Sequence, residues 1–353
     1  MNSARRLLRA FIAACLVGLL AACAPAPRPD PDARNPPLRP RVVTAPVPRD
    51  ADDPAIWVHP ADPARSLVLG TDKHRDGGLH AFDLQGRAVA RFAPLRRPNN
   101  VDVVRGLRLG GREIDVALVT EREAGQLRVF ALPELRPVDG GGLPVFAADP
   151  DRAPMGVAGY RRPGDGAVHA IVGGKSGPPD GYLWQYRLED DGAGVVRAVK
   201  VREFGRYSGR KEIEAIAVDA RRGWVYYSDE GFGVRKYHAD PDHPEAEREL
   251  AVLGDTGFAG DHEGIAVRDD GGDAGVIAVS NQQAGTIRLF AAAGDHRFLG
   301  AARISARETD GCEVSPGPLP GFPGGLFVAM STDRTFHLYA WDELVAAARA
   351  VAR

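Results

Sequence analysis

One short pattern occurs six times in the chain, and this repetition constrains the fold more than any other feature. Each copy leads into a short run of β-branched or other small apolar residues. The copies are Pro54-Ala-Ile-Trp-Val58, Asn100-Val-Asp-Val-Val104, Met155-Gly-Val-Ala-Gly159, Glu214-Ala-Ile-Ala-Val218, Glu263-Gly-Ile-Ala-Val267 and Asp310-Gly-Cys-Glu-Val314. Their first residues are 46, 55, 59, 49 and 47 positions apart, so a unit of about 50 residues is repeated.

Two further apolar runs follow each copy and predict a small antiparallel sheet. The second run follows a turn, as in Trp224–Tyr227, and the third ends on an aromatic residue, as in Leu79–Phe82. Five of the six units add a weaker fourth run. Short runs of this composition between turn formers are typical of strands. They predict an all-β protein, a six-bladed β-propeller over residues 47–353, with a short helix within Trp341–Arg353.

The first 22 residues predict an export signal. Three arginines within the first nine residues precede an apolar run, residues 10–22, that is too short to span a bilayer comfortably. The run ends as Leu20-Ala-Ala-Cys23, which resembles the bacterial lipobox. That resemblance implies removal of residues 1–22 and lipidation of Cys23. An ordinary secretory signal cut near residue 22 is the alternative.

Either signal predicts an exported protein. Residues 23–46 are rich in proline and arginine and contain few large apolar residues, which predicts a semi-extended tether. Lipid chains on Cys23 would hold the domain at a membrane surface without spanning the membrane. Ala24 follows the cysteine where an aspartate would signal retention at the inner membrane. We therefore expect the protein on the outer membrane, or in the periplasm.

Composition excludes a nucleic-acid-binding protein and a protein stabilised by disulfides. Lys+Arg 45 and Asp+Glu 47 give a net charge of −2, so no basic field is available to bind nucleic acid. Cys15 leaves with the signal and Cys23 would be acylated, so Cys312 remains alone and no intramolecular disulfide forms. A small buried thiol is expected at Cys312, with a catalytic thiol as the alternative. The propeller is expected to be a monomer.

Propeller geometry predicts that polar residues far apart in the sequence meet on one face. The inner strand of each blade lines the axial channel, and the second strand returns to the face where the inner strand begins. Residues at the inner-strand starts include Asp52, Asp53, Asn99, Asn100, Glu212, Glu214, Asp261, Glu263 and Asp310. Residues at the second-strand ends include Lys73, Arg122, Lys175, Asp229 and Glu230. We expect a ring of carboxylates and amides flanked by a few cations.

Such a ring calls for counter-charge, because neighbouring carboxylates raise one another's pKa. Oxygen ligands from Asp, Glu and Asn suit calcium. Zinc is disfavoured, since His262-Glu263 lacks the second histidine of a zincin helix. The cations (Lys73, Arg122, Lys175, Arg210 and Lys211) call for an anionic ligand such as phosphate. For any single acidic residue, turn capping is the alternative role. The scattered histidines, among them His80, His169, His296 and His337, are expected at the surface or rim.

Five motifs together resemble the β-propeller phytases. They are Asp50-Ala-Asp-Asp-Pro-Ala-Ile-Trp-Val58, Asn99-Asn-Val-Asp102, Asp261-His-Glu-Gly264, Thr309-Asp-Gly311 and Gly324-Gly-Leu-Phe-Val-Ala329. The resemblance runs from about Val47 to Leu344. Members of this family are six-bladed, calcium-dependent enzymes that release phosphate from phytate (myo-inositol hexakisphosphate). The resemblance implies a 3-phytase-like phosphomonoesterase with Ca²⁺ as cofactor and an inositol phosphate as anionic substrate.

Position by position, the resemblance also implies residue roles. The implied metal ligands are Asp52, Asp53, Glu214, Asp229, Glu230, Asp261, Glu263 and Asp310. The implied phosphate-binding residues are Lys73, Arg122 and Lys175. The implied mechanism is attack by a calcium-bound water on phosphorus, with Lys73, Arg122, Glu214 and Glu230 as catalytic residues.

The sequence departs from the family pattern at four places. Ala215 replaces a glycine, Met155 replaces a tyrosine, His74-Arg75 replaces a second lysine, and Glu313 replaces an aspartate. Two alternatives therefore stay open. A calcium-dependent lactonase or esterase would need the carboxylates without Lys73, Arg122 and Lys175. A non-catalytic propeller that binds a partner or glycan would be indifferent to Glu214→Gln.

Overall fold

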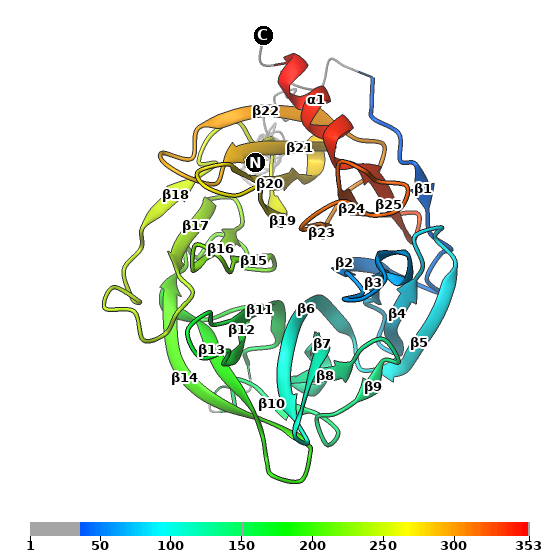
Figure 1. Ribbon diagram of the computed structural model, residues 1–353. Helices are drawn as coiled ribbons and strands as arrows, with labels where there is room; N and C mark the ends of the chain where they lie inside the picture. The colour runs from blue at the N-terminus through cyan, green and yellow to red at the C-terminus, as the bar shows by residue number, and fades with distance from the viewer. Residues whose placement is uncertain (1–35, 148, 150, 352–353) are drawn as a thin grey trace, which may run out of the picture.

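The repeated units form a closed ring of sheets. The computed structural model describes residues 36–147, 149 and 151–351. Over these residues the chain forms six antiparallel sheets around a central axis (Figure 1). The predicted six-bladed β-propeller is confirmed. The signal at residues 1–22 and the lipidation site at Cys23 lie outside the described residues.

The first three blades follow one another along the chain, each running from the axis outward. Blade 1 contains β2 (Ala51–Trp57), β3 (Leu67–Asp72), β4 (Gly77–Phe82) and β5 (Ala88–Leu95). Blade 2 contains β6 (Pro98–Leu109), β7 (Arg112–Glu121), β8 (Gln126–Ala131), β9 (Arg136–Pro137) and β10 (Leu143–Pro144). Blade 3 contains β11 (Pro154–Arg161), β12 (Val168–Gly174), β13 (Asp180–Asp190) and β14 (Val196–Arg206).

The last three blades complete the ring. Blade 4 contains β15 (Ile216–Asp219), β16 (Trp224–Asp229), β17 (Gly233–His238) and β18 (Ala251–Leu253). Blade 5 contains β19 (His262–Asp269), β20 (Gly275–Asn281), β21 (Thr286–Ala291) and β22 (Phe298–Arg303). Blade 6 contains β23 (Cys312–Val314), β24 (Leu326–Ser331), β25 (Thr335–Ala340) and β1 (Val42–Val43). Short 3₁₀ turns occur at η2 (Pro63–Arg65), η3 (Arg122–Ala124) and η4 (Gln282–Ala284).

The outer strand of blade 6 comes from the other end of the chain. In β1, Val42 lies opposite Leu338 of β25, and Leu38 forms a bridge with Ile304. Residues 36–46, which the composition assigns to a tether, therefore belong to the propeller, and the domain starts before the predicted boundary at residue 47. Pairing with β1 covers an edge of β25 that would otherwise expose unpaired backbone groups.

Apolar side chains pack between neighbouring blades. Among the described residues, each cluster of buried apolar side chains draws on two adjacent sheets. Leu69 of blade 1, for example, packs in one cluster with Val119 and Phe130 of blade 2, and all three are fully buried. Burial of one such side chain contributes about 1.5–3 kcal/mol. Both faces of a blade are covered, which explains why the second and third strands read as continuous apolar runs.

The predicted C-terminal helix is present as α1 (Trp341–Val351) and packs on blade 5. Leu344 and Ala348 are fully buried in the cluster between blades 5 and 6. Gly300 of β22, at φ 136°, allows this contact, since a Cβ atom there would lie 2.2 Å from the Ala348 carbonyl oxygen. Within the part of the chain that the structure describes, no helix combines the length and the apolar character needed to cross a membrane.

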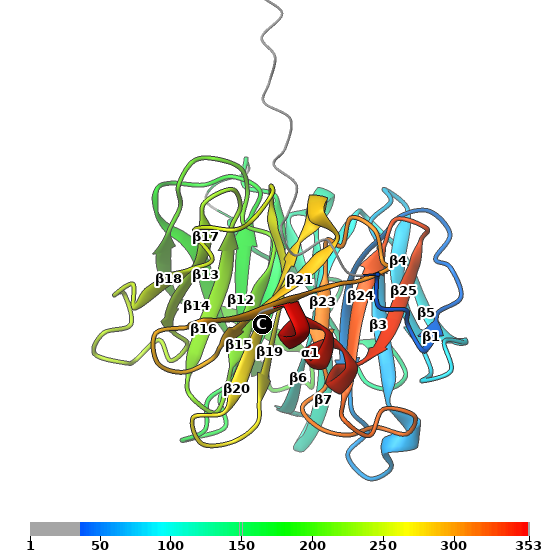
Figure 2. The same ribbon diagram turned by 90° about the horizontal axis from the view of Figure 1, so that it is seen from above.

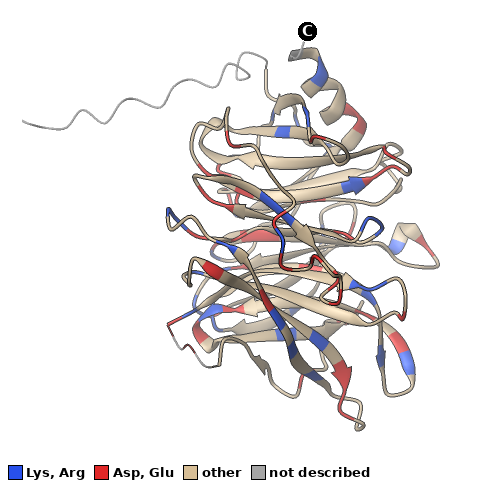
Figure 3. Cartoon of the chain, turned by 90° about the vertical axis from the view of Figure 1, so that its left-hand side faces the viewer, with Lys and Arg blue, Asp and Glu red and all other residues tan. Residues whose placement is uncertain are grey.

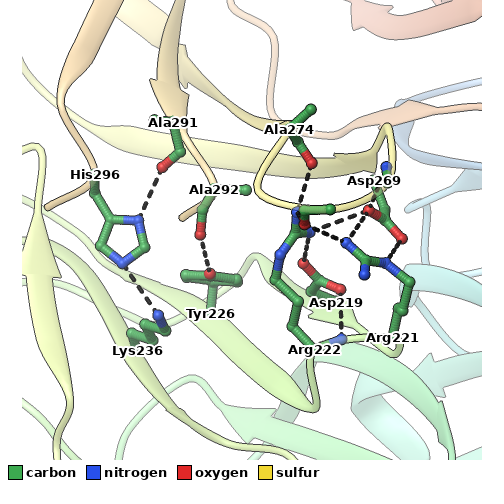
Figure 4. A network of polar contacts seen from close by, with 12 residues as sticks. Asp219, Arg221, Arg222, Tyr226, Lys236, Asp269, Ala274, Ala291, Ala292 and His296 are labelled. Atoms are coloured by element: carbon green, nitrogen blue, oxygen red, sulfur yellow. Dashed lines mark hydrogen bonds and ion pairs between the residues drawn. The ribbon is translucent and has the colours of Figure 1, made fainter. Parts of the chain in front are cut away.

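Charged residues of both signs are interspersed along the outer side of the blades (Figure 3). Some of these charged residues form ion pairs that join neighbouring blades. Arg222 of blade 4 binds Asp219 of its own blade at 2.6 Å and Asp269 of blade 5 at 3.2 Å (Figure 4). Arginine is suited to this role because its planar group can bind several acceptors at once.

The expectation that the histidines lie at the surface or rim is wrong for four of them. His80, His169, His296 and His337 are each at most 7% exposed, and burial lowers the pKa of each ring. His296 lies at the junction of blades 4 and 5, where Lys236 Nζ donates to its Nε2 at 3.2 Å (Figure 4). The four rings are buried because they lie on faces that neighbouring blades cover, which isolated positions in a sequence do not reveal.

We predict that β1 contributes to stability as a blade strand. A protein that starts at residue 47 should unfold at a temperature lower by on the order of 5–10 °C than one that starts at residue 36, because β25 loses its outer partner and Leu38 its packing. Thermal unfolding followed by circular dichroism measures the difference. Equal unfolding temperatures would mean that residues 36–46 act only as a tether.

Candidate metal and phosphate site

The site lies on the face where the inner strands begin. In each blade the start of the inner strand lies beside the end of the second strand, as where Ala51 pairs with Asp72 and His262 with Asn281. Loops from all six blades therefore border one mouth of the axial channel, and Figure 2 shows the blades edge-on. This arrangement brings together side chains that are as far apart in the sequence as residues 52 and 310.

Five carboxylates from blades 4 and 5 form two overlapping clusters. One oxygen from each of Glu212, Glu214 and Glu230 lies within 4.8 Å of the others, and the same holds for Glu230, Asp261 and Glu263. Glu230 belongs to both clusters. Glu212 is absent from the predicted ligands, although it stands two residues before Glu214, and side chains two apart on an extended segment point to the same side.

Several of these oxygens are buried without a partner. Glu230 Oε1 and Glu263 Oε2 accept no hydrogen bond from the described residues. Burial and then repulsion from Glu214 raise the pKa of Glu230 to about 9, and the same causes raise the pKa of Glu263 well above its usual range. Burial also raises the pKa of Glu214, partly offset by Lys73. A buried carboxylate left without a counter-charge is costly, so the site suits a bound cation.

Lys73 lies between two other carboxylates of the mouth. Its ammonium group contacts Asp52 and lies 3.1 Å from Asp310. Asp52 is fully buried, and neither of its oxygens accepts a well-aligned hydrogen bond from the described residues. Burial raises the pKa of Asp52, and the charge of Lys73 opposes this rise. Blade 1 and blade 6 are therefore joined at the mouth by a lysine between two aspartates.

Further cations among the described residues border the mouth. Lys175 pairs with Glu212 at 2.6 Å, and Lys211 pairs with Asp261. Arg122 is half-buried and forms no ion pair with any described residue, and its Nε is buried without an acceptor. Its charge lowers the pKa of Glu214, which indicates that it lies near that carboxylate. Arg122 is therefore free to bind an anion at the mouth.

Amide side chains hold some of the carboxylates in place. Asn99 Nδ2 donates to Glu214 Oε1 at 2.5 Å. Gln283 Nε2 donates to Asp261 at 2.7 Å, and Gln282 Nε2 donates to Asp310 at 2.5 Å. The two glutamines lie in η4, directly after β20, and neither is among the residues predicted for the mouth. Their N–H groups restrain the carboxylates of Asp261 and Asp310.

Asp229 does not fit its predicted role as a metal ligand. It accepts hydrogen bonds from the backbone N–H and the hydroxyl of Ser208, at 2.8 and 2.6 Å, and from Arg235 at 2.8 Å. Both its oxygens are therefore occupied, and they hold the loop that carries Lys211 and Glu212. The sequence places Asp229 beside Glu230, but adjacent residues on a strand point to opposite sides.

Asp53 lies inside the channel, apart from the two carboxylate clusters, and its role as a metal ligand stays a prediction. It lines a small cavity, about 20 Å³, with Asp102, Cys312 and Glu313. Its carboxylate accepts a hydrogen bond from the Val101 N–H at 2.9 Å, and burial raises its pKa well above the usual range. Cys312 is a buried free thiol, as expected. Met155 is buried too, so it offers no surface to a ligand at the mouth.

The donor set fits a hard divalent cation. Both clusters consist only of carboxylates, without histidine or cysteine among the described residues. Oxygen donors of this kind suit Ca²⁺ or Mg²⁺, and a large, irregular set favours Ca²⁺. The metal ion would be held by Glu212, Glu214, Glu230, Asp261 and Glu263. The positively charged side chains on the other side of the mouth would face an anion.

The chain is similar to known proteins in sequence and in fold. A family model described as Phytase matches residues 14–337. A curated relative described as 3-phytase, from Bacillus subtilis (strain 168), is 27% identical over 317 residues, which cover 83% of this chain and 80% of the relative. A solved structure of a luciferin-regenerating enzyme superposes with a TM-score of 0.55 at 13% identity, covering 85% of this chain and 95% of that chain. The last likeness concerns the fold alone.

We predict that the metal-free protein loses stability as the pH rises. A carboxyl group with a raised pKa in the folded state binds its proton more tightly there than in the unfolded chain, so it favours folding at low pH and loses that contribution as pH rises through the folded pKa. Glu230 (pKa about 9) and Glu313 (pKa about 8), against usual values of 4.5, place this loss between about pH 5 and pH 9.

Thermal unfolding in chelator at pH 6, 7, 8 and 9 measures the effect, and the unfolding temperature should fall along this series. Added Ca²⁺ should raise the unfolding temperature most at pH 9, where the carboxylates are most fully ionised. An unfolding temperature in chelator that rises with pH would contradict the assignment of these groups.

Proposed function

The chain belongs to the phytase family, and on this premise we propose that it hydrolyses phytate to lower inositol phosphates and phosphate with a calcium-activated water. The observation that carries the proposal is the arrangement of the mouth. A carboxylate cluster in blades 4 and 5 lies near Lys73 of blade 1 and near Arg122 of blade 2, which forms no ion pair with a described residue. A site for a metal alone would need no cation there, whereas a site for a phosphate ester needs both.

The protein side chains have distinct roles in this proposal. Glu212, Glu214, Glu230, Asp261 and Glu263 hold Ca²⁺. When bound, the cation neutralises phosphate charge and makes a water molecule more acidic. Lys73, Arg122 and Lys175 bind phosphate oxygens and stabilise the negative charge that develops in the transition state. Glu230 Oε1 has no partner among the described residues and can take up a proton from the attacking water.

Asn99 supports this arrangement indirectly. Its donation to Glu214 fixes the carboxylate beside Arg122 and Glu230 and leaves the second oxygen of Glu214 for the cation. Residues that orient a metal-binding carboxylate in this way affect metal affinity without touching substrate.

We predict that Glu214→Gln lowers kcat/KM for phytate by on the order of 10²-fold, because it removes a charged ligand at the centre of the cluster. Phosphate release is measured with Ca²⁺ and with chelator. Glu203→Gln is the matched control, since Glu203 is an exposed glutamate of β14 that pairs with Lys200. It should leave the rate unchanged.

Chelator should abolish the release of phosphate from phytate by the wild-type protein, and added Ca²⁺ should restore this release. Release that is insensitive to both chelator and Glu214→Gln would contradict the metal-dependent reaction. Calcium-dependent binding of phytate without any release would indicate a non-catalytic binding propeller.

We further propose that the protein is exported and carries lipid on Cys23. The lipobox-like end of the apolar run supports this proposal. Expression in bacteria with an alkyne-tagged fatty acid should label the wild-type protein and the Cys15→Ala variant, and should not label Cys23→Ala. Labelling that persists in Cys23→Ala, or that is absent from the wild-type protein, would contradict it.

A further inference from the structure

The lysines of this chain are concentrated at the mouth. The chain has five lysines, and three of them pair with mouth carboxylates. These pairs are Lys73 with Asp52 and Asp310, Lys175 with Glu212, and Lys211 with Asp261. The other two lie elsewhere. Lys200 pairs with Glu203 on blade 3. Lys236 contacts His296 between blades 4 and 5 (Figure 4) and also lies over the Trp224 ring.

The buried ion pairs that stabilise the fold away from the mouth contain arginine rather than lysine. Of the 45 cationic residues, 40 are arginines (45 minus five lysines). Buried pairs away from the metal clusters, such as Arg128 with Asp139 and Arg222 with Asp219, involve a guanidinium group. A guanidinium group binds a carboxylate through two fixed N–H groups, whereas an ammonium group is a compact point charge on a flexible stem. Lysine is therefore the residue that leaves a carboxylate more easily.

The lysines are also more exposed than their main partners. The Lys211 side chain is 51% exposed, while that of Asp261 is 9% exposed. The Lys73 side chain is 21% exposed, while that of Asp52 is fully buried. The ammonium groups can therefore move toward solvent while the carboxylates stay fixed in the mouth.

The balance of charge at the mouth favours replacement of the lysine ammonium groups by a metal ion. Among the described residues, seven carboxylates border it (Asp52, Glu212, Glu214, Glu230, Asp261, Glu263 and Asp310) against five cations (Lys73, Arg122, Lys175, Arg210, whose guanidinium group binds the Gly231 carbonyl beside Glu230, and Lys211), which leaves two negative charges when all are ionised. In this fully ionised state, the balance of charge repels a polyanion and attracts a divalent cation. Lys175 and Lys211 each pair with a carboxylate of the two clusters, and Lys73 pairs with two further carboxylates of the same mouth, Asp52 and Asp310.

We propose that Lys73, Lys175 and Lys211 are exchangeable counter-ions of the mouth. A divalent cation displaces their ammonium groups from the carboxylates, and the released groups bind the phosphates of the substrate. Lys211 thereby becomes a substrate-binding residue, although in the metal-free protein it is paired with Asp261. The inference rests on the proposed function, and it implies that cation binding precedes and strengthens polyanion binding.

The displacement can be measured lysine by lysine without any turnover. Acetylation with an N-hydroxysuccinimide ester at pH 8, read by mass spectrometry, gives a rate for each of the five lysines. Added Ca²⁺ should increase the rates at Lys73 and Lys211, and myo-inositol hexakissulfate, a non-hydrolysable polyanion, should then decrease them. Lys200 should react at one rate throughout, and the buried Lys236 should stay slow throughout.

Calorimetry on variants tests the coupling. In Lys211→Met, Ca²⁺ alone should bind about two- to fivefold more tightly, because no ammonium group competes for Asp261. The same variant should bind hexakissulfate more weakly in the presence of Ca²⁺. Lys211→Arg should retain polyanion binding without the gain in Ca²⁺ affinity. Lys200→Met is the matched control and should change neither affinity. In the wild-type protein, Ca²⁺ should strengthen hexakissulfate binding by about 5- to 150-fold.

The outcomes separate this inference from the proposed function. Calcium-dependent exposure of Lys73 and Lys211 without phytate hydrolysis would support the exchange and contradict the reaction. Hydrolysis that depends on Ca²⁺, with lysine rates that do not change or that fall on Ca²⁺ addition, would support the reaction and overturn the exchange. Tighter Ca²⁺ binding in Lys200→Met equal to that in Lys211→Met would also overturn it.

Discussion

Apolar packing between neighbouring blades is the constraint on which the rest of the structure depends. No blade buries its faces alone, so the six sheets must form a closed ring before every blade is covered on both faces. The same packing places the starts of six inner strands around one narrow mouth. Residues as distant in sequence as Asp52 and Asp310 then contact the same lysine.

That convergence has an electrostatic cost. Carboxylates such as Glu230 and Glu263 are buried near one another with oxygens that accept no hydrogen bond from the described residues. The fold holds them in place because hydrophobic packing elsewhere is strong enough to offset their repulsion. A site that is destabilised in this way when empty binds a cation strongly, because binding relieves the repulsion. In the proposed function, metal binding and substrate binding are linked through the same charges, and the proposed exchange makes the lysines of the mouth the groups that connect the two.

Much of the fold could be predicted because strand patterns are local. The six-fold repeat, the apolar runs and the turn residues between them predict both the number of blades and the order of their strands. The boundary between tether and domain, predicted at residue 47, lies after β1, which belongs to the propeller. β1 is only two residues long and its apolar signal is weak, so its strand identity depends on pairing with β25, about 300 residues away. The buried histidines were misplaced for a similar reason, since their burial depends on the neighbouring blade.

The sequence by itself determined the propeller, the acidic character of the mouth, and the presence of lysines and arginine beside it. Only the tertiary structure decided which of those residues act together. Asp229 and Glu230 are adjacent in sequence, yet Asp229 binds Ser208 and Arg235 while Glu230 joins both carboxylate clusters. Glu212 is part of a cluster, and Asp53 lies in the channel. The physical reason is that composition and spacing fix which face a strand end reaches, whereas side-chain direction and the partners across the mouth depend on how six separate blades meet.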